Sequence, residues 1–214
     1  MESATQEERD YNDLVIRAFR SMAPIYDWMT LPIRRLRDQA VDFAAAPAGA
    51  AVLDVATGTG DQALAFARRG YRVTAFDLTD AMLERATRKR DAEKVHFELG
   101  DATRMRYPSH SFDVVTVSFA LHDMIPSIRQ RALKEMARVV RPSGTLLIVD
   151  YGLPRNRVGQ ALVYRLVCLY EGETYRAFVH SDMRAQLGQA GISVTDERAG
   201  TLGAARMWKG HRGL

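Results

Sequence analysis

Short apolar stretches alternate with amphipathic ones along the middle of the chain, and this alternation predicts the fold. Stretches dense in Val, Leu, Phe and Ala, typical of buried strands, cover residues 51–56, 71–77, 95–99, 112–120 and 145–150. Between them, apolar residues return every three or four positions, as on one face of a helix, most clearly over 128–140. Strands that alternate with helices form a parallel sheet, so we expect an α/β fold.

The N-terminal part of the chain does not follow this alternation. Residues 1–10 are polar, and we expect them to be disordered or frayed. Residues 11–22 place apolar side chains at helical spacing with arginines between them, which predicts an amphipathic helix that Pro24 ends or kinks. Residues 31–46 indicate a further, basic helix, and a Pro-Ala-Gly sequence separates it from the first strand. The remaining residues, 47–214, are expected to form one domain.

The C-terminal part also departs from the alternation. One long helix is predicted over 156–179, and a second helix is predicted to end at Gly191. Two short strands, over 192–197 and 204–209, are expected to close the chain as a hairpin.

The loop after the first strand is the first candidate binding site. Gly58 and Gly60 allow positive φ and a close approach of a ligand to the backbone. Residues 58–63 also fit the G-x-G-x-x-G/A pattern of dinucleotide-binding proteins, which leaves an NAD-dependent oxidoreductase open. However, Asp54 and Asp61 flank the loop, and like charges about 4 Å apart repel by roughly 4 kcal/mol at an effective dielectric near 20. This favours a cationic ligand such as S-adenosylmethionine over a pyrophosphate.

Two further acids follow at the ends of the next strands. Asp77 ends the second strand, 19 positions after Gly58, where an acid can accept hydrogen bonds from ribose hydroxyls. Asp101 follows the third strand and could accept a hydrogen bond from an adenine amino group. Because ligands bind at the carboxyl ends of parallel strands, these acids and the end of the fourth strand are expected to converge on one crevice.

Through this glycine loop and these acids, the chain resembles the class I S-adenosylmethionine-dependent methyltransferases. It is similar in particular to the ubiquinone/menaquinone C-methyltransferases. The resemblance covers roughly residues 20–150. It is carried by residues 53–61, 76–78, 100–102, 111–115 and 135–144. It implies a Rossmann-like, doubly wound, mostly parallel seven-stranded sheet with an antiparallel C-terminal strand. It also implies S-adenosyl-L-methionine as cofactor and S-adenosyl-L-homocysteine as product. The implied cofactor-binding residues are Asp54, Gly58, Thr59, Gly60, Asp77, Leu78, Asp101, Ala102 and Ser118.

Candidate catalytic residues lie in the loop after the fourth strand. His122 can accept a proton near neutral pH, and Asp123 could orient it or share the role. Alternatively, His122 only caps the loop or contacts the cofactor. The quinone methyltransferases usually have Arg-Asn at these two positions, so the chain departs from the family pattern here.

Residues outside the central motifs are candidates for a lid or an acceptor site. The quinone methyltransferases have a similar Tyr-Asp pair before their first strand, so the resemblance implies that residues 1–46, with Tyr26, form a lid over cofactor or substrate. The alternative is a helix that only packs on the sheet edge. Tyr175 and His180 lie near the predicted helix junction and are weaker candidates for acceptor binding, with a core or surface role as the alternative.

Composition limits the partners. The 214 residues suit one domain, and the net charge of +4 arises from basic residues mixed with acids and without interleaved aromatics, so nucleic acid is not the expected partner. Cys168 is the only cysteine, which excludes an internal disulfide and indicates a reducing compartment. No metal site and no leader peptide are expected, and the predicted location is the cytoplasm.

The function predicted from the sequence is methyl transfer to a small or lipophilic acceptor, with a quinol-like ring carbon as the leading hypothesis. One alternative is an amine acceptor such as a phospholipid head group, which the N-terminal amphipathic helix could reach by peripheral membrane contact. The same residues would also fit an NAD-binding oxidoreductase or a cofactor-binding protein without catalytic activity.

Overall fold

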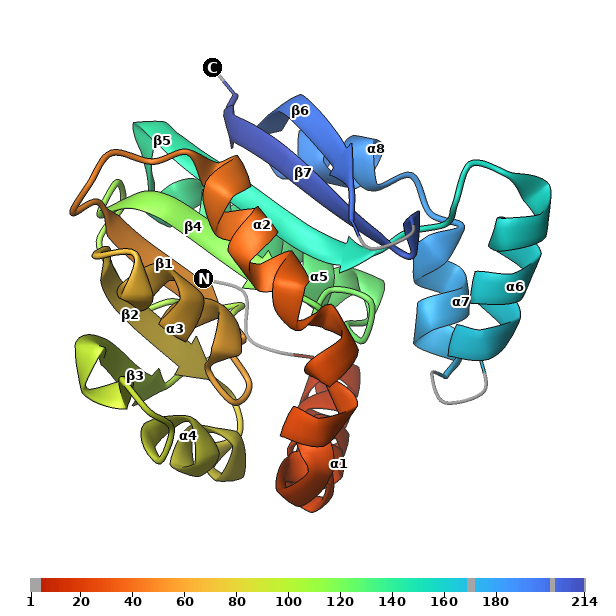
Figure 1. Cartoon of the computed structure of the whole chain (residues 1–214), viewed down its shortest axis with the longest axis horizontal. Coiled ribbons are helices and arrows are strands. Elements are labelled where there is room, and N and C mark those ends of the chain that lie inside the picture. Colours follow the sequence, from red (N-terminus) through yellow and green to blue (C-terminus); the bar gives the residue numbers. More distant parts are fainter. Residues whose placement is uncertain (1–4, 169–171, 201–202, 214) are drawn as a thin grey trace.

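In the computed structural model of the chain, which describes residues 5–168, 172–200 and 203–213, a seven-stranded sheet forms the middle layer between helices (Figure 1). The strands are β1 Ala51–Val55, β2 Arg72–Asp77, β3 Val95–Leu99, β4 Phe112–Ser118, β5 Val140–Tyr151, β6 Ile192–Ala199 and β7 Ala205–Arg212. Their order is β3-β2-β1-β4-β5-β7-β6. The first five strands pair in parallel, and β7 pairs antiparallel with both β5 and β6. This confirms the predicted mostly parallel sheet with an antiparallel C-terminal strand.

The helices complete the two outer layers. They are α1 Gln6–Met29, α2 Arg34–Ala44, α3 Asp61–Arg68, α4 Asp80–Thr87, α5 Pro126–Val139, α6 Arg157–Val167, α7 Glu173–Val179 and α8 Met183–Gln189, with short 3₁₀ turns at Leu31–Ile33 and Ala92–Lys94. One buried apolar cluster lies between the sheet and α2 and α3, and another between the sheet and α5 and α8. Both faces of the central strands are therefore buried, which explains why those strands are apolar throughout.

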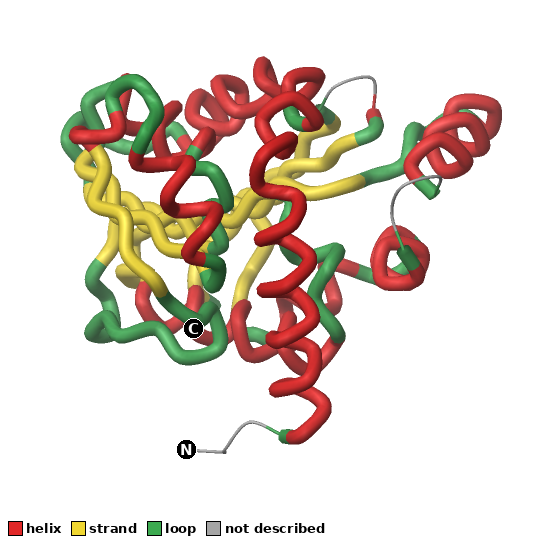
Figure 2. The backbone as a smooth tube through the Cα atoms, turned by 90° about the horizontal axis from the view of Figure 1, so that it is seen from below, coloured by secondary structure: helices red, strands yellow, loops and turns green. Residues whose placement is uncertain are grey.

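The strand order reverses between β1 and β4, and this positions the functional site. From β1 the chain adds β2 and then β3 on one side, and it returns to place β4 on the other side. In an open α/β sheet, ligands bind outside the carboxyl ends of the strands at such a switch point. Helix α1 lies in front of the strands in Figure 2, on the lower side of the molecule as drawn in Figure 1.

The N-terminal helix is longer at both ends than the sequence predicts. Residues 6–10 are helical, so the expectation of disorder is wrong for them: Thr5 and Glu8 form a capping box, and Glu8 binds Arg131 of α5 at 2.6 Å. The helix also continues through Pro24 to Met29. A proline inside a helix costs about 3 kcal/mol. The contacts that Tyr26 and Asp27 make with the glycine loop lie beyond the proline and offset this cost.

The single long helix predicted over 156–179 is wrong. The structure has two helices there, α6 and α7, with residues 169–171 outside the described chain. The ring of Tyr164 lies 6.3 Å from the ring of Tyr175. In one continuous helix, 11 residues would separate these positions by about 16 Å along the axis. The pairing of the two rings therefore requires the chain to turn back between them.

The other element boundaries differ by smaller amounts. Helix α5 ends at Val139, close to the predicted stop, but β5 begins at once at Val140 instead of residue 145.

Among the described residues, no helix is both long and apolar enough to cross a membrane.

Candidate active site

A narrow cleft runs along the carboxyl ends of β1, β2 and β4, beneath α1. Tyr11, Val15, Phe19 and Tyr26 of α1 form one wall, and the loops after the strands form the other. The cleft encloses about 90 Å³. Ligand pockets usually measure roughly 300–1,000 Å³. The α1 side chains therefore occupy much of the space that a cofactor-sized ligand would fill.

The two glycines of the first loop have different surroundings. Both are in the left-handed region, with φ of +56° at Gly58 and +80° at Gly60. A Cβ on Gly58 would lie 3.6 Å from the ring of Tyr26, so this glycine faces the cleft under α1. A Cβ on Gly60 would lie 2.9 Å from the ring of Phe97 on β3. Gly58 thus borders the ligand space, whereas Gly60 allows close packing inside the domain.

Asp54 is buried below this loop at the end of β1. Its Oδ2 accepts a hydrogen bond of 2.6 Å from Thr57 Oγ1, and its Oδ1 has no hydrogen-bond partner among the described side chains and backbone. Burial, partly offset by the Thr57 hydrogen bond, raises the pKa of Asp54 to about 7. A buried carboxylate oxygen with unused acceptor capacity suits a ligand that carries an ammonium or a hydroxyl group, as S-adenosylmethionine does.

The acid on the outer side of the loop is already neutralised. Lys89 Nζ binds the carboxylate of Asp61, and Arg37 Nε lies 3.7 Å from it. Thr59 Oγ1 donates a hydrogen bond of 2.6 Å to Asp27 of α1, so its side chain takes part in this ionic cluster. The expectation that Asp61 offers a free negative charge to a cationic ligand is therefore wrong.

Asp77 and Asp101 lie at the cleft, as the strand ends predict. Asp77 Oδ2 accepts a hydrogen bond from Gly58 N at 2.8 Å, and Oδ1 accepts one from Thr79 N at 2.9 Å. Burial raises the pKa of Asp77 above its usual range. An ionised carboxylate has about four acceptor sites, so the Asp77 oxygens can still accept from a ligand hydroxyl. Two further predicted cofactor residues, Leu78 and Ala102, also line this cleft.

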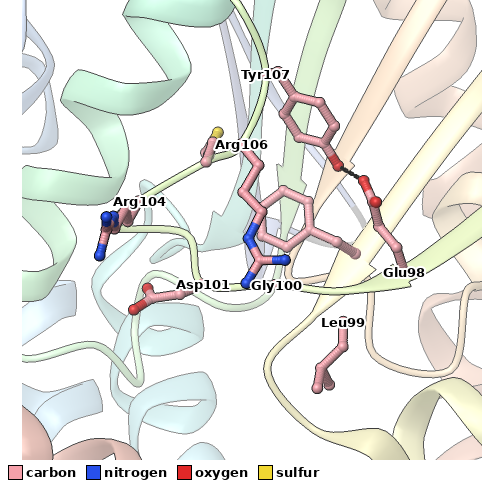
Figure 3. Close-up of a pocket in the computed structure, with 9 residues that line it drawn as sticks. Glu98, Leu99, Gly100, Asp101, Arg104, Arg106 and Tyr107 are labelled. Atoms are coloured by element: carbon pink, nitrogen blue, oxygen red, sulfur yellow. Dashed lines mark hydrogen bonds between the residues drawn. The ribbon is translucent and has the colours of Figure 1, made fainter.

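A second cavity of about 300 Å³ adjoins the cleft beside β3, and Asp101 borders both. Figure 3 shows the Arg106 side chain between Asp101 and the pair formed by Tyr107 and Glu98. The Tyr107 hydroxyl donates to the Glu98 carboxylate, and burial together with this carboxylate raises the pKa of the phenol above its usual range. A ligand that contacts Asp101 can extend from the cleft into this second space.

The loop after β4 carries the predicted catalytic residues in a buried hydrogen-bonded arrangement. His122 Nδ1 lies 2.8 Å from Asp150 Oδ1, and His122 Nε2 lies 3.4 Å from Asp123 Oδ2. Because an ionised carboxylate only accepts hydrogen bonds, Nδ1 donates to Asp150, which leaves Nε2 of a neutral imidazole as an acceptor. A proton taken up at Nε2 is then stabilised by Asp123. The His122 ring itself lines neither cavity, so a bound group would deliver its proton to Nε2 beside Asp123, which borders the cleft.

Sequence reasoning missed Asp150. It is fully buried, and its Oδ2 accepts hydrogen bonds from Leu121 N at 3.0 Å and from His122 N at 3.3 Å. A signal was present, since Asp150 is the last polar residue of the fifth predicted strand, as Asp77 is of the second. Its partner could not be deduced, because the contact with His122 depends on β4 and β5 being neighbours.

Two side chains from other helices hold the His122 loop in place. Arg129 of α5 donates to Leu121 O and to Met124 O, both at 2.8 Å. Tyr11 of α1 donates to Asp123 O at 2.8 Å. The loop is thus fixed by contacts on both sides before any ligand binds, and neither contact was predicted.

The remaining predicted residues lie outside the cleft. The Ser118 hydroxyl is buried within the fold and lines neither cavity beside Asp101. Tyr175 is buried against Tyr151, with ring centres 5.1 Å apart, and the Tyr151 ring lies 4.6 Å from the His122 ring. His180 packs on Tyr164 at the end of α7 and borders a different cavity. The structure therefore does not bring Ser118, Tyr175 or His180 into contact with the cleft.

Known proteins match the chain across nearly its whole length. The Methyltransferase domain family matches residues 52–144. The demethylmenaquinone methyltransferase of Deinococcus radiodurans is 32% identical, over 96% of this chain and 95% of the relative. The ubiquinone/menaquinone biosynthesis C-methyltransferase UbiE of Geobacter sulfurreducens is 27% identical, over 92% and 87% of the two chains.

Solved structures agree on the fold. A TehB-like SAM-dependent methyltransferase from Corynebacterium glutamicum superposes with a TM-score of 0.66 at 14% identity, over 90% of this chain and 98% of the other. Family membership decides between the two cofactors that the glycine pattern left open. The chain belongs to the class I S-adenosylmethionine-dependent methyltransferases, in the family of the demethylmenaquinone and ubiquinone C-methyltransferases, and its cofactor is S-adenosylmethionine.

Proposed function

We propose that the methyl acceptor is a quinol-like aromatic ring and that a ring carbon is methylated. The observation that carries this proposal is the buried arrangement of His122 between Asp150 and Asp123. It lies on the loop whose residues Ala120, Asp123 and Met124 line the cleft. The names of the relatives, which are quinone methyltransferases, support the same acceptor class.

The chemistry of a quinol explains why a base is needed. Bound S-adenosylmethionine supplies a methyl group that its sulfonium already activates. A ring carbon becomes a strong nucleophile when a neighbouring hydroxyl group loses its proton, because the oxygen then donates electron density into the ring. His122 takes this proton at Nε2, while Asp150 holds the ring through Nδ1. Asp123 stabilises the resulting imidazolium. Once the ring carbon carries the methyl group, it loses its own hydrogen as a proton, which restores the aromatic ring. The oxygen regains a proton from the imidazolium, so that one proton in total leaves to solvent.

The other residues around the cleft would bind the cofactor and align its methyl group with the acceptor. Gly58, Asp77, Leu78, Asp101 and Ala102 border the space on the strand side and would hold the cofactor there. Asp77 is suited to ribose hydroxyls and Asp101 to an adenine amino group, as the strand ends predict. Alignment of the methyl group with the acceptor carbon is the main contribution of the fold to the rate, because the reaction is an in-line displacement.

Helix α1 acts as the lid in this proposal. Polar contacts hold it on the domain, among them Arg20 with Asp80 at 2.9 Å, Asp27 with Lys89 at 2.6 Å, and the Tyr11 hydroxyl with Asp123 O at 2.8 Å. The first two connect α1 to α4 and its C-terminal flank, and the third connects α1 to the catalytic loop. Closure of α1 would therefore have two effects at once: it would exclude water from the cofactor, and it would position the loop that carries His122.

The acceptor can be tested directly with the purified protein and S-adenosylmethionine carrying a labelled methyl group. The candidate acceptors are a short-chain demethylmenaquinol kept reduced, the same compound oxidised to the quinone, and phosphatidylethanolamine. We expect carbon methylation of the reduced quinol and none of the oxidised form, as resolved by mass spectrometry of fragments. Labelling of the amine, or of a quinol oxygen, would contradict the proposed acceptor while leaving the methyltransferase assignment intact.

A further inference from the structure

The outer face of α6 carries an exposed apolar stripe. Val158, Leu162 and Leu166 follow one another at four-residue spacing and are 81%, 59% and 52% exposed. The other face of the helix packs on α7, where the rings of Tyr164 and Tyr175 stack. Figure 1 shows α6 at the outer edge of the molecule, beyond α7. Within the described part of the chain, nothing covers this stripe.

The charge around the stripe is positive. Arg155, Arg157 and Arg165 are exposed on or beside α6. The sequence has no Asp or Glu from residue 151 to residue 170. On the neighbouring helix α7, Glu173 pairs with Arg176 at 2.9 Å, and no acid among the described residues pairs with an arginine of α6. The surface therefore combines an apolar ridge with a cationic border.

We infer that α6 docks on an anionic membrane surface, with Val158, Leu162 and Leu166 inserted among the lipid head groups. An interfacial helix of this kind presents apolar residues on one face and Lys or Arg beside them. Each basic residue close to an anionic surface adds favourable electrostatic free energy. The inference goes beyond the proposed function and does not depend on the identity of the acceptor.

A second copy of the chain fits this face less well. Antiparallel pairing of two α6 helices would bring the arginines of both copies together, and like charges repel. Stable protein interfaces also bury at least about 1,200 Å² in total, which three side chains from each copy cannot provide. Charge complementarity therefore selects the lipid surface.

Helix α1 was the membrane-contacting element predicted from the sequence, and it is less suitable. It also exposes apolar side chains, with Trp28 at 76%, but its exposed surface includes the acids Glu7, Asp10 and Asp13. An anionic surface repels these acids. In contrast, α6 follows shortly after Tyr151, whose ring lies 4.6 Å from the ring of His122. Docking through α6 would place the catalytic loop close to the bilayer.

The test is flotation of the full chain with vesicles of phosphatidylcholine alone or with roughly one third phosphatidylglycerol. One variant combines Leu162→Gln with Leu166→Gln, and a second combines Arg157→Gln with Arg165→Gln. The matched control combines Leu14→Gln with Ile25→Gln on α1. All six side chains are exposed, so each variant is expected to keep the melting temperature and S-adenosylhomocysteine affinity of the unmodified chain.

We expect the unmodified chain to bind the anionic vesicles and not the neutral ones. The arginine variant should bind about 25-fold more weakly and the leucine variant at least about tenfold more weakly, with the α1 control unchanged. Absence of binding to anionic vesicles, or a loss confined to the α1 control, would overturn the inference. A change of oligomeric state in the leucine variant without a change in vesicle binding would also overturn it, in favour of a second copy.

Discussion

Asp54 and Asp150 are both buried acids on central strands of the same sheet, but the protein satisfies only one of them. Asp150, on β5, accepts hydrogen bonds from the backbone of Leu121, His122 and Tyr151 and from the His122 ring. Asp54, at the end of β1, accepts a side-chain hydrogen bond from Thr57, and its Oδ1 has no hydrogen-bond partner in the described chain.

The difference separates two kinds of functional region. Removing a partner from a buried, satisfied acid is costly, so such an acid fixes geometry. Asp150 thus positions the catalytic loop. A buried acid with one unsatisfied oxygen destabilises the fold until a ligand or a proton satisfies it. Asp54 is an acid of this second kind. Its raised pKa of about 7 reflects the free energy that burial of the ionised carboxylate costs the folded state.

The largest expected effect is on catalysis, at the site where Asp150 of β5 holds His122 of the loop after β4; we call this site the β5 end, and the loop around Asp54 the β1 end. Replacement His122→Asn removes the group that accepts the quinol proton, so kcat/KM should fall by about 10²–10⁴-fold, the usual contribution of a general base. The affinity for S-adenosylhomocysteine, measured by calorimetry, should change little, because the ring lines neither cavity beside Asp101. His180→Asn, at the end of α7, is the matched control. A His122→Asn enzyme with more than a tenth of the original rate would exclude the base role.

The second effect is on stability at the β1 end. Between pH 4 and 7 the native chain holds a proton on Asp54 that the unfolded chain has lost, so its free energy of unfolding falls as pH rises through this window. A pKa difference of about three units corresponds to at most about 4 kcal/mol. In Asp54→Asn the part of this dependence that Asp54 causes should disappear, while the part caused by Asp77 remains. The variant should therefore gain stability relative to the original chain as pH rises. Urea unfolding at pH 5 and pH 8 measures the difference, and parallel pH profiles of the two proteins would contradict it.

The third effect distinguishes the two acids. Asp150→Asn leaves some of its backbone and imidazole donors without a partner, which should cost about 2–3 kcal/mol of stability at neutral pH. Because the new amide can donate to Nδ1, the neutral imidazole would carry its proton on Nε2 and could no longer act as a base. The pH–rate profile should therefore change as well as the rate. Loss of stability with an unchanged profile would show that Asp150 has only a structural role.

The β1 end could largely be predicted from the sequence because its geometry is local. Asp54, Gly58 and Asp77 belong to one strand, loop, helix and strand unit, and the spacing alone indicates that they meet. The parallel sheet followed in the same way from the alternation of apolar runs. What the spacing could not show is that Lys89 neutralises Asp61, because that contact depends on how α3 and α4 pack.

The β5 end could be predicted only in part because its contacts join distant residues. Residue type and loop position indicated His122, but Asp150 lies 28 residues away and meets it across two paired strands. The start of α1 depends similarly on Glu8, which contacts Arg131 at a separation of 123 residues. A polar N-terminal segment is typical of disorder when considered alone, and the capping box together with this tertiary contact stabilises it as a helix.

The smallest expected effect is the difference in stability between alanine replacements of the two glycines in the loop after Asp54. Gly58→Ala and Gly60→Ala both force a left-handed residue to carry a Cβ, which costs about 1–2 kcal/mol. At Gly60 the Cβ also meets the Phe97 ring at 2.9 Å, and overpacking adds about 1–3 kcal/mol, so Gly60→Ala should be the less stable variant. At Gly58 the nearest atoms belong to Tyr26 of the lid, so Gly58→Ala should instead weaken binding of S-adenosylhomocysteine. Thermal unfolding and calorimetry on both variants measure these outcomes. Equal losses of stability and of affinity would show that the two glycines share one role.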